Sequence, residues 1–593
     1  MTNVKPALDP VHAERSPSPA LVAAVLGIVA FAGILLGMPR ELGIYDEGII
    51  LLDAMRVLHG DIPHRDFYAN YGPAQYYAVA SIFSVFGKSF ISARIYDVLL
   101  RSITVSIFYI IVNRYCRFSI SLVATGVAGL WLLSSATYLY PVFPCLLFAL
   151  LGSYLVARFG EGKSGVFALA AAGACTGLTA LFRYETGFFL LLAHMIALML
   201  TSLSRERRDR LRGLVAAVGA YGVGTALIFV PAAVAFLFVS PPAPFLADII
   251  GYPTKYYALM RGLPFPGPSA LRETPQDAAV YLPFLAVGLA LFALLRPGGE
   301  TPRPSRAFFA RDRATIYLVV FGGVAAMFLL KGIVRVSAIH MLLSIVPSLI
   351  VFAILAERLW RRGHWAKAAA AFLMLVALAP AVFSAKQWFG QSIHTPDRTL
   401  AGWMAVRAGL VRLSPTAAGR CESGPASGVA MLPEDYARVA NYLAAHTAAD
   451  EPIMVGLDRH DKIFVNPVAL YFASGRLSST HWHQFDPGLQ TRADVQADIV
   501  HELASRHVRW VVRDSSFEVV NEPNGSSKSS GVVLLDRYLA AHYRPVAASG
   551  KIAIWLVNGE PAPRGATRPA KCEAAPLESQ AFADAAESNR GAG

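Results

Sequence analysis

Charge is scarce in this sequence. Only 16% of its 593 residues are charged, whereas soluble globular chains carry roughly 25%. This deficit argues against an ordinary soluble enzyme, and the 55% share of hydrophobic residues excludes a disordered protein. Cysteine is scarce as well, because five residues are too few for a disulfide scaffold. The region after residue 385 lacks a G-x-G-x-x-G phosphate fingerprint, so nothing there indicates nucleotide binding.

Long apolar runs are abundant in the sequence. Mean hydropathy is +0.46, and runs of about 18 residues or more can cross a bilayer core. The sequence therefore predicts a polytopic α-helical membrane protein. We expect about eleven membrane-spanning helices, at 21–38, 89–112, 119–136, 142–158, 165–182, 186–203, 213–239, 279–296, 314–331, 338–357 and 368–385.

The basic residues indicate how the chain is oriented. Lys and Arg gather in alternate connectors, and the connectors between them, at 137–141, 183–185 and 332–337, hold few. Basic connectors face the cytoplasm, so we predict a cytoplasmic N-terminus and no nucleic-acid partner, although the net charge is +13. The Ala- and Arg-rich composition is typical of a bacterium, which would make the outer side periplasmic and the membrane the inner one. The basic connectors are 114–117, 158–163, 205–212, 296–313 and 358–367.

Four regions follow from this pattern. Residues 1–20 form a cytoplasmic tail and 21–385 the membrane domain, whose first span is a retained anchor. Residues 386–560 alternate short apolar strands with helical stretches, which predicts an extracytoplasmic α/β domain. Residues 561–593 have the composition of a disordered tail. Cys421 and Cys572 are a candidate disulfide on the oxidising side, and two free thiols are the alternative.

The first outer segment, 39–88, is too long and polar for a simple connector. It holds Asp46 and Glu47 shortly after the first span, and Asp66 further on. Carboxylates near a membrane are costly unless they are solvated or used. The alternative for Asp46 and Glu47 is a helix N-terminus, where a cap and the dipole favour acids. We expect helical stretches at 49–58 and 74–87, the second lying in the interface.

Other ionisable residues fall on the same predicted side. Charges on a membrane helix face the bundle interior or a wet cavity rather than lipid. We therefore expect a shared outward-facing cavity, lined by acids and cations. The residues concerned are Arg183, Tyr184 and Glu185 in one outer turn, Lys331, Arg335 and His340 around another, Lys255 in the loop 240–278, and Arg94 on the second span. Arg94 shares one helical face with Asp97 and Arg101, because the three are spaced i, i+3 and i+7.

These residue types suit chemistry on a lipid phosphate. Guanidinium groups grip phosphate oxygens bidentately, and a phosphate at the membrane interface most naturally belongs to a lipid carrier. A nearby carboxylate can take the proton of an acceptor hydroxyl as general base. The predicted reaction is transfer of a group from a lipid phosphate to a hydroxyl. No residues have the spacing of a zinc site, so we expect no required cofactor and leave a loosely bound Mg²⁺ or Mn²⁺ ion open.

The motifs around these residues resemble a known family. Tyr45-Asp46-Glu47-Gly48, with the later Arg65-Asp66-Phe67 and Gly72-Pro73, is similar to the first outer loop of the GT-C superfamily of integral-membrane glycosyltransferases. That superfamily includes protein O-mannosyltransferases, the lipid A aminoarabinose transferase and a bacterial galacturonosyltransferase-like group. The resemblance covers roughly residues 20–385. Further matching runs are Phe86-Gly87-Lys88-Ser89 with Ala93-Arg94, Phe182-Arg183-Tyr184-Glu185-Thr186-Gly187, and Arg335, His340 and Pro347.

The resemblance implies inverting transfer of a sugar from a polyprenyl-phosphate donor to a glycan, lipid or protein acceptor. Asp46 would be the general base, Glu47 would support it or share its role, and Asp66 would be a second acid. Arg183 and Arg335 would bind the lipid phosphate, with Lys331 and His340 beside them. Where an acid is expected next to Arg335, this chain has Val336-Ser337. The C-terminal domain would bind the acceptor or act as a lid.

Two other functions stay open from the sequence. A flippase or transporter of a lipid-linked sugar would show internal repeats and broken helices near the midplane, and no convincing repeat is present. A glycan ligase or polymerase would use a lipid pyrophosphate and would not need the Asp46-Glu47 pair. Two further motifs are assigned structural roles: Asp458–Asp461 as a turn after a strand, and His481-Trp482-His483 as a strand with exposed imidazoles.

Overall fold

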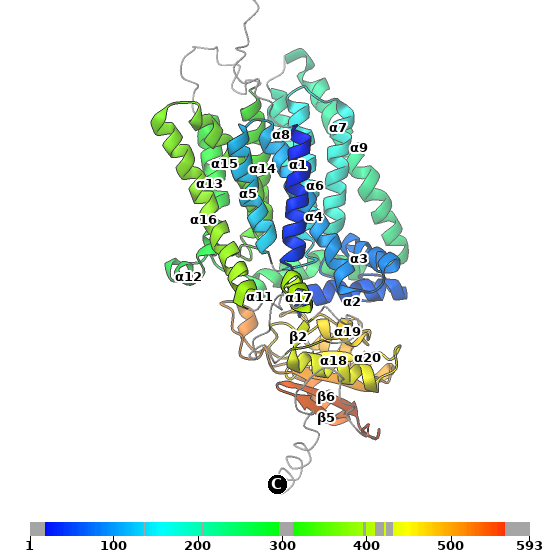
Figure 1. Cartoon of the computed structure of the whole chain (residues 1–593). Helices are drawn as coiled ribbons and strands as arrows, with labels where there is room; N and C mark the ends of the chain where they lie inside the picture. Colours follow the sequence, from blue (N-terminus) through cyan, green and yellow to red (C-terminus); the bar gives the residue numbers. More distant parts are fainter. Residues whose placement is uncertain are drawn as a thin grey trace, which may run out of the picture.

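The computed structural model describes residues 18–135, 137–203, 207–295, 312–394, 399–408, 420–422 and 431–563. A bundle of long helices makes up one part of the molecule, and a smaller part of helices and strands lies at one end of it (Figure 1). The predicted fold class, a polytopic helical membrane protein with a C-terminal α/β domain, is confirmed.

The bundle contains all of the predicted apolar segments as helices. Within the described chain, nine helices are long and apolar enough to cross a membrane, and two more, α5 and α7, are apolar but shorter. The count of eleven spans therefore stays a prediction. The last helix runs nine residues past its predicted end at 385. The bundle helices are α1 (Pro19–Leu36), α4 (Phe90–Asn113), α5 (Phe118–Ser134), α6 (Val142–Gly160), α7 (Val166–Phe182), α8 (Tyr184–Leu203), α9 (Arg207–Val239), α13 (Leu282–Leu295), α14 (Arg313–Gly332), α15 (Leu342–Trp360) and α16 (His364–His394).

A charged face of α4 is buried inside this bundle, as predicted. Arg94, Asp97 and Arg101 are each at most 1% exposed. Arg101 pairs with Asp97 at 2.7 Å and donates to the Leu132 carbonyl, near the end of α5. The charges on α4 are thus paired within protein, which is how a polar face is accommodated at membrane depth.

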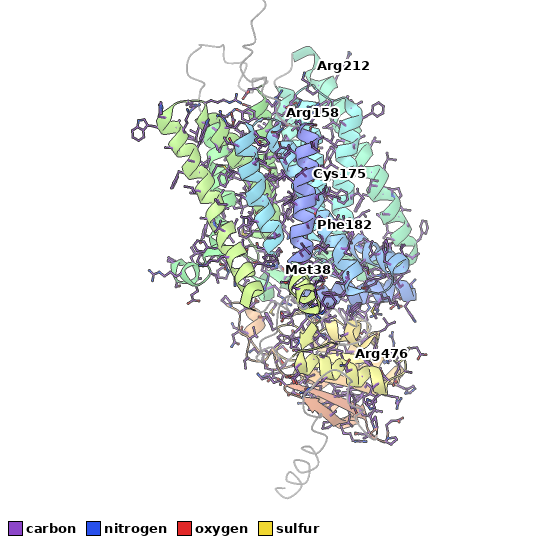
Figure 2. The ribbon with its side chains drawn as sticks, in the orientation of Figure 1. Met38, Arg158, Cys175, Phe182, Arg212 and Arg476 are labelled. Atoms are coloured by element: carbon purple, nitrogen blue, oxygen red, sulfur yellow. The ribbon has the colours of Figure 1, made fainter. Side chains whose placement is uncertain are left out.

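The described parts of the basic connectors lie at the end of the bundle away from the C-terminal domain (Figure 1). Figure 2 shows Arg158 and Arg212 at that end. There the Glu161 carboxylate lies 3.6 Å from Arg158, 3.5 Å from Arg114 and 3.0 Å from Arg313. Basic side chains at one end of the bundle are what the positive-inside rule describes.

Short helices connect the bundle to the C-terminal domain. Two of them, α2 (Asp46–His59) and α3 (Pro73–Phe86), correspond to the predicted helical stretches and lie near the lower end of the bundle (Figure 1). The segment after α9 includes two single-turn π-helices, a form often found at functional sites. Its elements are α10 (Pro242–Leu246), η1 (Ala247–Gly251), η2 (Pro253–Tyr257), α11 (Ala258–Arg261), α12 (Pro268–Glu273) and η3 (Pro275–Tyr281).

The C-terminal domain is built on a four-stranded sheet with strand order β3-β4-β6-β5. Strand β3 runs parallel to β4, and the other pairs are antiparallel. Cys421 lies in β1 and Cys572 lies outside the described residues, so the candidate disulfide is untested. The elements are α17 (Leu400–Arg407), β1 (Arg420–Glu422), β2 (Met431–Pro433), α18 (Glu434–His446), β3 (Met454–Leu457), α19 (Ala469–Ser474), α20 (Ala493–Ser505), β4 (Trp510–Asp514), η7 (Gly525–Ser527), α21 (Leu534–His542), β5 (Tyr543–Ser549) and β6 (Ile552–Val557).

Helix α2 joins the C-terminal domain through buried polar contacts. The Arg56 guanidinium donates to the Thr480 carbonyl at 2.9 Å, and Asp53 lies 2.7 Å from the His483 ring, with both side chains fully buried. The prediction of a strand with exposed imidazoles at His481-Trp482-His483 is therefore wrong: the segment is not a strand, and α2 covers His483. The segment Asp458–Asp461, predicted as a turn, is a bend that directly follows β3.

Gly48 lets α2 approach α19 closely, which gives a test of this junction. A Cβ at position 48 would lie 2.8 Å from the Ala469 Cα, so backbone atoms would have to shift to make room for it. We expect Gly48→Ala to lower the free energy of unfolding by about 1–3 kcal/mol through overpacking, measured as a lower melting temperature. Gly126→Ala in α5 is the matched control, because nothing lies within 4 Å of that position. Equal melting temperatures for the two variants would contradict this account.

Candidate active site

Asp46 and Glu47 are adjacent at the start of α2 and face different surroundings, because successive helical residues are turned by about 100°. Glu47 is 3% exposed. Both of its oxygens accept hydrogen bonds from Arg94 at 2.6 Å, and one also accepts from the Gly43 N–H at 2.8 Å. Glu47 therefore fixes α2 against α4 and has no free edge toward a substrate.

The Asp46 carboxylate, in contrast, is accessible. Among the described residues, none forms a hydrogen bond or ion pair with it. Desolvation by the surrounding protein raises the pKa of Asp46 above its ordinary value; Arg261, Arg335 and Arg183 oppose that rise, and Asp486 adds to it. Asp46 is thus an available carboxylate beside several arginines.

Four cations lie around His340, and we call them the cation cluster: Arg183, Arg261, Lys331 and Arg335. Burial and these four charges together hold the pKa of His340 well below its usual range, so the ring is neutral at pH 7. Its Nδ1 atom lies 2.6 Å from the Ser337 hydroxyl. Figure 2 places Phe182, the residue before Arg183, at the end of the bundle nearer the C-terminal domain.

Arg183 is held at the turn between α7 and α8. Its Nε atom donates to Glu185 at 2.7 Å, and a terminal nitrogen donates to the Tyr140 hydroxyl at 3.3 Å. The Lys331 ammonium lies 4.0 Å from the same Glu185 oxygen. The rings of Tyr71 and Tyr140 each lie 5.5 Å from the guanidinium carbon. The predicted grouping of Arg183, Glu185 and Lys331 is therefore present in the structure.

The other two arginines of the cation cluster pair with the C-terminal domain. Arg335 donates from both terminal nitrogens to the two oxygens of Glu522, at 3.0 and 2.7 Å. Arg261 donates from Nε and a terminal nitrogen to one oxygen of Asp486, at 3.2 and 2.6 Å. Glu522 supplies the acid that the sequence around Arg335 lacks. Sequence reasoning missed Asp486 and Glu522, because no local pattern connects them to residues 150 or more positions earlier.

Several predicted site residues lie apart from this group. Asp66 pairs with Arg65 at 2.7 Å; burial tends to raise its pKa, but hydrogen bonds from Arg65 and the Ile62 N–H lower it overall. Lys255 is exposed. The Tyr184 hydroxyl lies 3.4 Å from His64.

The chemistry available at the site is that of an anion-binding group beside a carboxylate base. Guanidinium and ammonium groups bind phosphate oxygens, and a carboxylate with a raised pKa can accept a proton. Among the described residues, no group of three His, Cys, Asp or Glu side chains could hold a metal ion.

Comparison with known proteins gives structural likenesses only. No family model matches the sequence, and no curated protein matches it. Among solved structures, ArnT from Cupriavidus metallidurans in the apo state is 15% identical, with a TM-score of 0.49 over 90% of this chain and 97% of that one. ArnT bound to undecaprenyl phosphate has a TM-score of 0.47 at 13% identity, over the same shares of the two chains.

The archaeal oligosaccharyltransferase AglB from Archaeoglobus fulgidus, in complex with an inhibitory peptide and a dolichol-phosphate, is 12% identical, with a TM-score of 0.46 over 84% of this chain and 70% of that one. AglB and ArnT are GT-C membrane glycosyltransferases, the group that the sequence resembles. At TM-scores below 0.5, these likenesses assign neither a family nor a function to this chain.

The contrast between the two adjacent acids predicts different effects on stability. Glu47→Ala would leave Arg94 buried without its partner, which costs roughly 3–5 kcal/mol, so we expect a large fall in melting temperature. Asp46→Asn removes a carboxylate without a partner, so we expect an unchanged or slightly higher melting temperature. Thermal unfolding of both variants in the same detergent checks this. Similar losses in the two variants would contradict the assignment.

Proposed function

We propose that this protein is a membrane glycosyltransferase that transfers a sugar from a polyprenyl-phosphate donor to an acceptor hydroxyl at the non-cytoplasmic face. The observation that carries the proposal is the accessible carboxylate of Asp46 beside the three arginines of the cation cluster. The donor phosphate binds to the cation cluster, and Asp46 acts as the general base.

Donor binding rests on N–H groups that the protein does not use. Each arginine of the cation cluster is fixed by a carboxylate through part of its guanidinium: Arg183 by Glu185, Arg261 by Asp486 and Arg335 by Glu522. A guanidinium has five N–H donors, so some remain for phosphate oxygens. Anchored arginines also lose less conformational entropy when a phosphate binds. The Lys331 side chain adds a further N–H donor, and the neutral His340 ring can donate one hydrogen bond.

The chemical step follows from the position of Asp46. The acceptor oxygen forms a bond to the anomeric carbon while its proton passes to Asp46, and the bond from that carbon to the phosphate oxygen breaks. The lipid monophosphate leaves with the electron pair, stabilised by the cation cluster, so no acid is needed to protonate it. Attack opposite the leaving group inverts the anomeric centre. The raised pKa of Asp46 favours proton uptake.

The remaining residues have supporting roles in the proposal. Glu47 supports the base by holding the start of α2 against Arg94, and Asp66, paired with Arg65, is a weaker candidate for a second acid. No cofactor is required, and a loosely bound Mg²⁺ or Mn²⁺ ion is the alternative. The basic end of the bundle faces the cytoplasm, so the site and the C-terminal domain face the periplasm across a bacterial inner membrane.

Asp46→Asn tests the function directly. We expect transfer to fall by about 10²–10⁴-fold, the usual contribution of a general base, while donor binding is kept. The assay offers purified protein in nanodiscs a panel of synthetic polyprenyl-monophosphate sugars and measures both sugar transfer and thermal stabilisation. Asp498→Asn, on the exposed side of α20, is the matched control.

Three results would overturn this proposal in different ways. Full activity of Asp46→Asn would show that Asp46 is only an acid at the N-terminus of α2 and not the general base. Stabilisation by a lipid pyrophosphate oligosaccharide, and by no monophosphate, would favour the ligase or polymerase. Binding and movement of a lipid-linked sugar across the membrane without transfer would favour the flippase.

Arg183→Ala is expected to weaken donor binding about ten- to a hundredfold, because a charge-assisted hydrogen bond contributes about 1.5–3 kcal/mol. Binding of the acceptor should change little. The donor dissociation constant, from ligand-dependent melting temperatures, checks this against Arg537→Ala, an exposed arginine of α21. If the two variants bind donor equally well, Arg183 is a structural residue of its turn.

A further inference from the structure

Two of the three arginines in the cation cluster are fixed by residues from beyond the last bundle helix. Arg335 and Arg261 come from the segments that connect bundle helices, whereas Glu522 and Asp486 belong to the C-terminal domain. The two segments are also joined by their backbones, because the Leu263 N–H bonds to the Val334 carbonyl and the Val336 N–H bonds to the Leu263 carbonyl.

Glu522 engages only part of Arg335. Both terminal nitrogens donate to the carboxylate, and one of them also donates to the Arg261 carbonyl at 2.7 Å. Among the described residues, none accepts a hydrogen bond from the Nε–H of Arg335. Glu522 therefore holds the end of the guanidinium and leaves its side edge available.

Asp486 binds the side edge of the Arg261 guanidinium, whereas Glu522 binds the end of the Arg335 guanidinium. The Oδ1 atom of Asp486 accepts from Nε and one terminal nitrogen of Arg261, so the other terminal nitrogen has no carboxylate partner among the described residues. Arg261 is 6% exposed and Asp486 is also 6% exposed. A pair so deeply buried is a lasting part of the structure, since separating it would leave two unpaired charges in protein.

Each carboxylate is itself held in place. Asp486 lies in a loop where its own N–H donates to the Gln490 side chain at 2.7 Å. Glu522 accepts from the Asn524 amide at 2.9 Å, and the same amide donates to the Gly262 carbonyl at 3.0 Å. Carboxylates fixed by their own loops orient the arginines. They are poorly suited to swing away when a phosphate arrives.

The same contacts reach the start of α2. The Tyr45 hydroxyl donates to the Phe485 carbonyl at 3.2 Å, which places the residue before Asp46 against the residue before Asp486. Asp486, Arg261 and Arg335 are all among the charges that set the pKa of Asp46. The carboxylates of the C-terminal domain, the cation cluster and the base therefore share one neighbourhood.

We propose that Glu522 and Asp486 of the C-terminal domain are positioning residues for the donor phosphate, which act by orienting Arg335 and Arg261. This inference rests on the proposed function and assigns the C-terminal domain to the donor site, in addition to any role with the acceptor. A phosphate then binds the side edge of Arg335 while Glu522 stays in place. Without the C-terminal domain, the bundle would still carry Arg261 and Arg335, but the carboxylates that orient them would be missing.

The experiment measures binding of a short-chain polyprenyl monophosphate to the full-length protein in nanodiscs, with the phosphate-free polyprenol as a second probe. We expect Glu522→Gln to raise the dissociation constant for the monophosphate about tenfold, the effect of losing one charge-assisted hydrogen-bonded partner. Polyprenol binding and the melting temperature should not change. Glu522→Asp, which keeps the charge, should recover part of the affinity. Glu560→Gln is the matched control, because Glu560 is exposed and pairs with Arg509 away from the site.

A double-mutant cycle separates positioning from a general structural effect. In an Arg335→Gln background, Glu522→Gln should cause no further loss of monophosphate affinity, because its effect passes through Arg335. Asp486→Asn with Arg261→Gln provides a second, independent cycle should one of the first variants fold poorly.

Each other outcome overturns the inference. Tighter binding by Glu522→Gln would show that the carboxylate competes with phosphate for Arg335, and unchanged binding would show that Glu522 has no part in the site. An equal loss in both backgrounds would indicate a structural role. If the wild-type protein binds no monophosphate, the proposed function fails as well, whereas wild-type binding with an unaffected Glu522→Gln variant removes this inference alone.

Discussion

The buried ion pair between Glu47 and Arg94 is the contact on which the site depends. It joins the first residues of α2 to the second bundle helix through two hydrogen bonds of 2.6 Å. Because Glu47 faces the bundle, its neighbour Asp46 faces away from it and stays accessible. Removing either partner would leave an unpaired charge in protein, so the pair fixes the orientation of α2 strongly. The two acids of one motif thus differ: Glu47 anchors α2, and in the proposed mechanism Asp46 accepts the proton.

The sequence was informative where a local pattern carried the signal. Apolar runs located the bundle helices, and the spacing of Arg94, Asp97 and Arg101 predicted a buried face of α4, which the structure confirms. The partners of Arg335 and Arg261 could not be predicted in this way. Glu522 follows Arg335 by 187 residues and Asp486 follows Arg261 by 225, and no periodicity connects positions so far apart. These pairs arise from how the C-terminal domain docks.

His483 is a second case in which a local sequence pattern could not predict the partner of a side chain. His483 follows Trp482 in a predicted extracytoplasmic domain and is predicted from the sequence to be exposed, yet it is fully buried against Asp53. What buries it is α2, a segment more than 400 residues earlier in the chain. The junction of bundle and C-terminal domain is polar and closely packed, with Gly48 against Ala469. Such an interface sets a single docked arrangement, because each buried polar group needs its own partner.

The dependence of the cation cluster on Asp486 and Glu522 has a consequence for how the protein is made. The ribosome completes every bundle helix before it reaches either residue. While the nascent chain is being inserted, Arg261 and Arg335 are already present but lack their carboxylates, so the proposed donor site is incomplete. That site forms only when the last part of the chain has folded onto α2. A polypeptide truncated after α16 would therefore still lack the two carboxylates that orient these arginines.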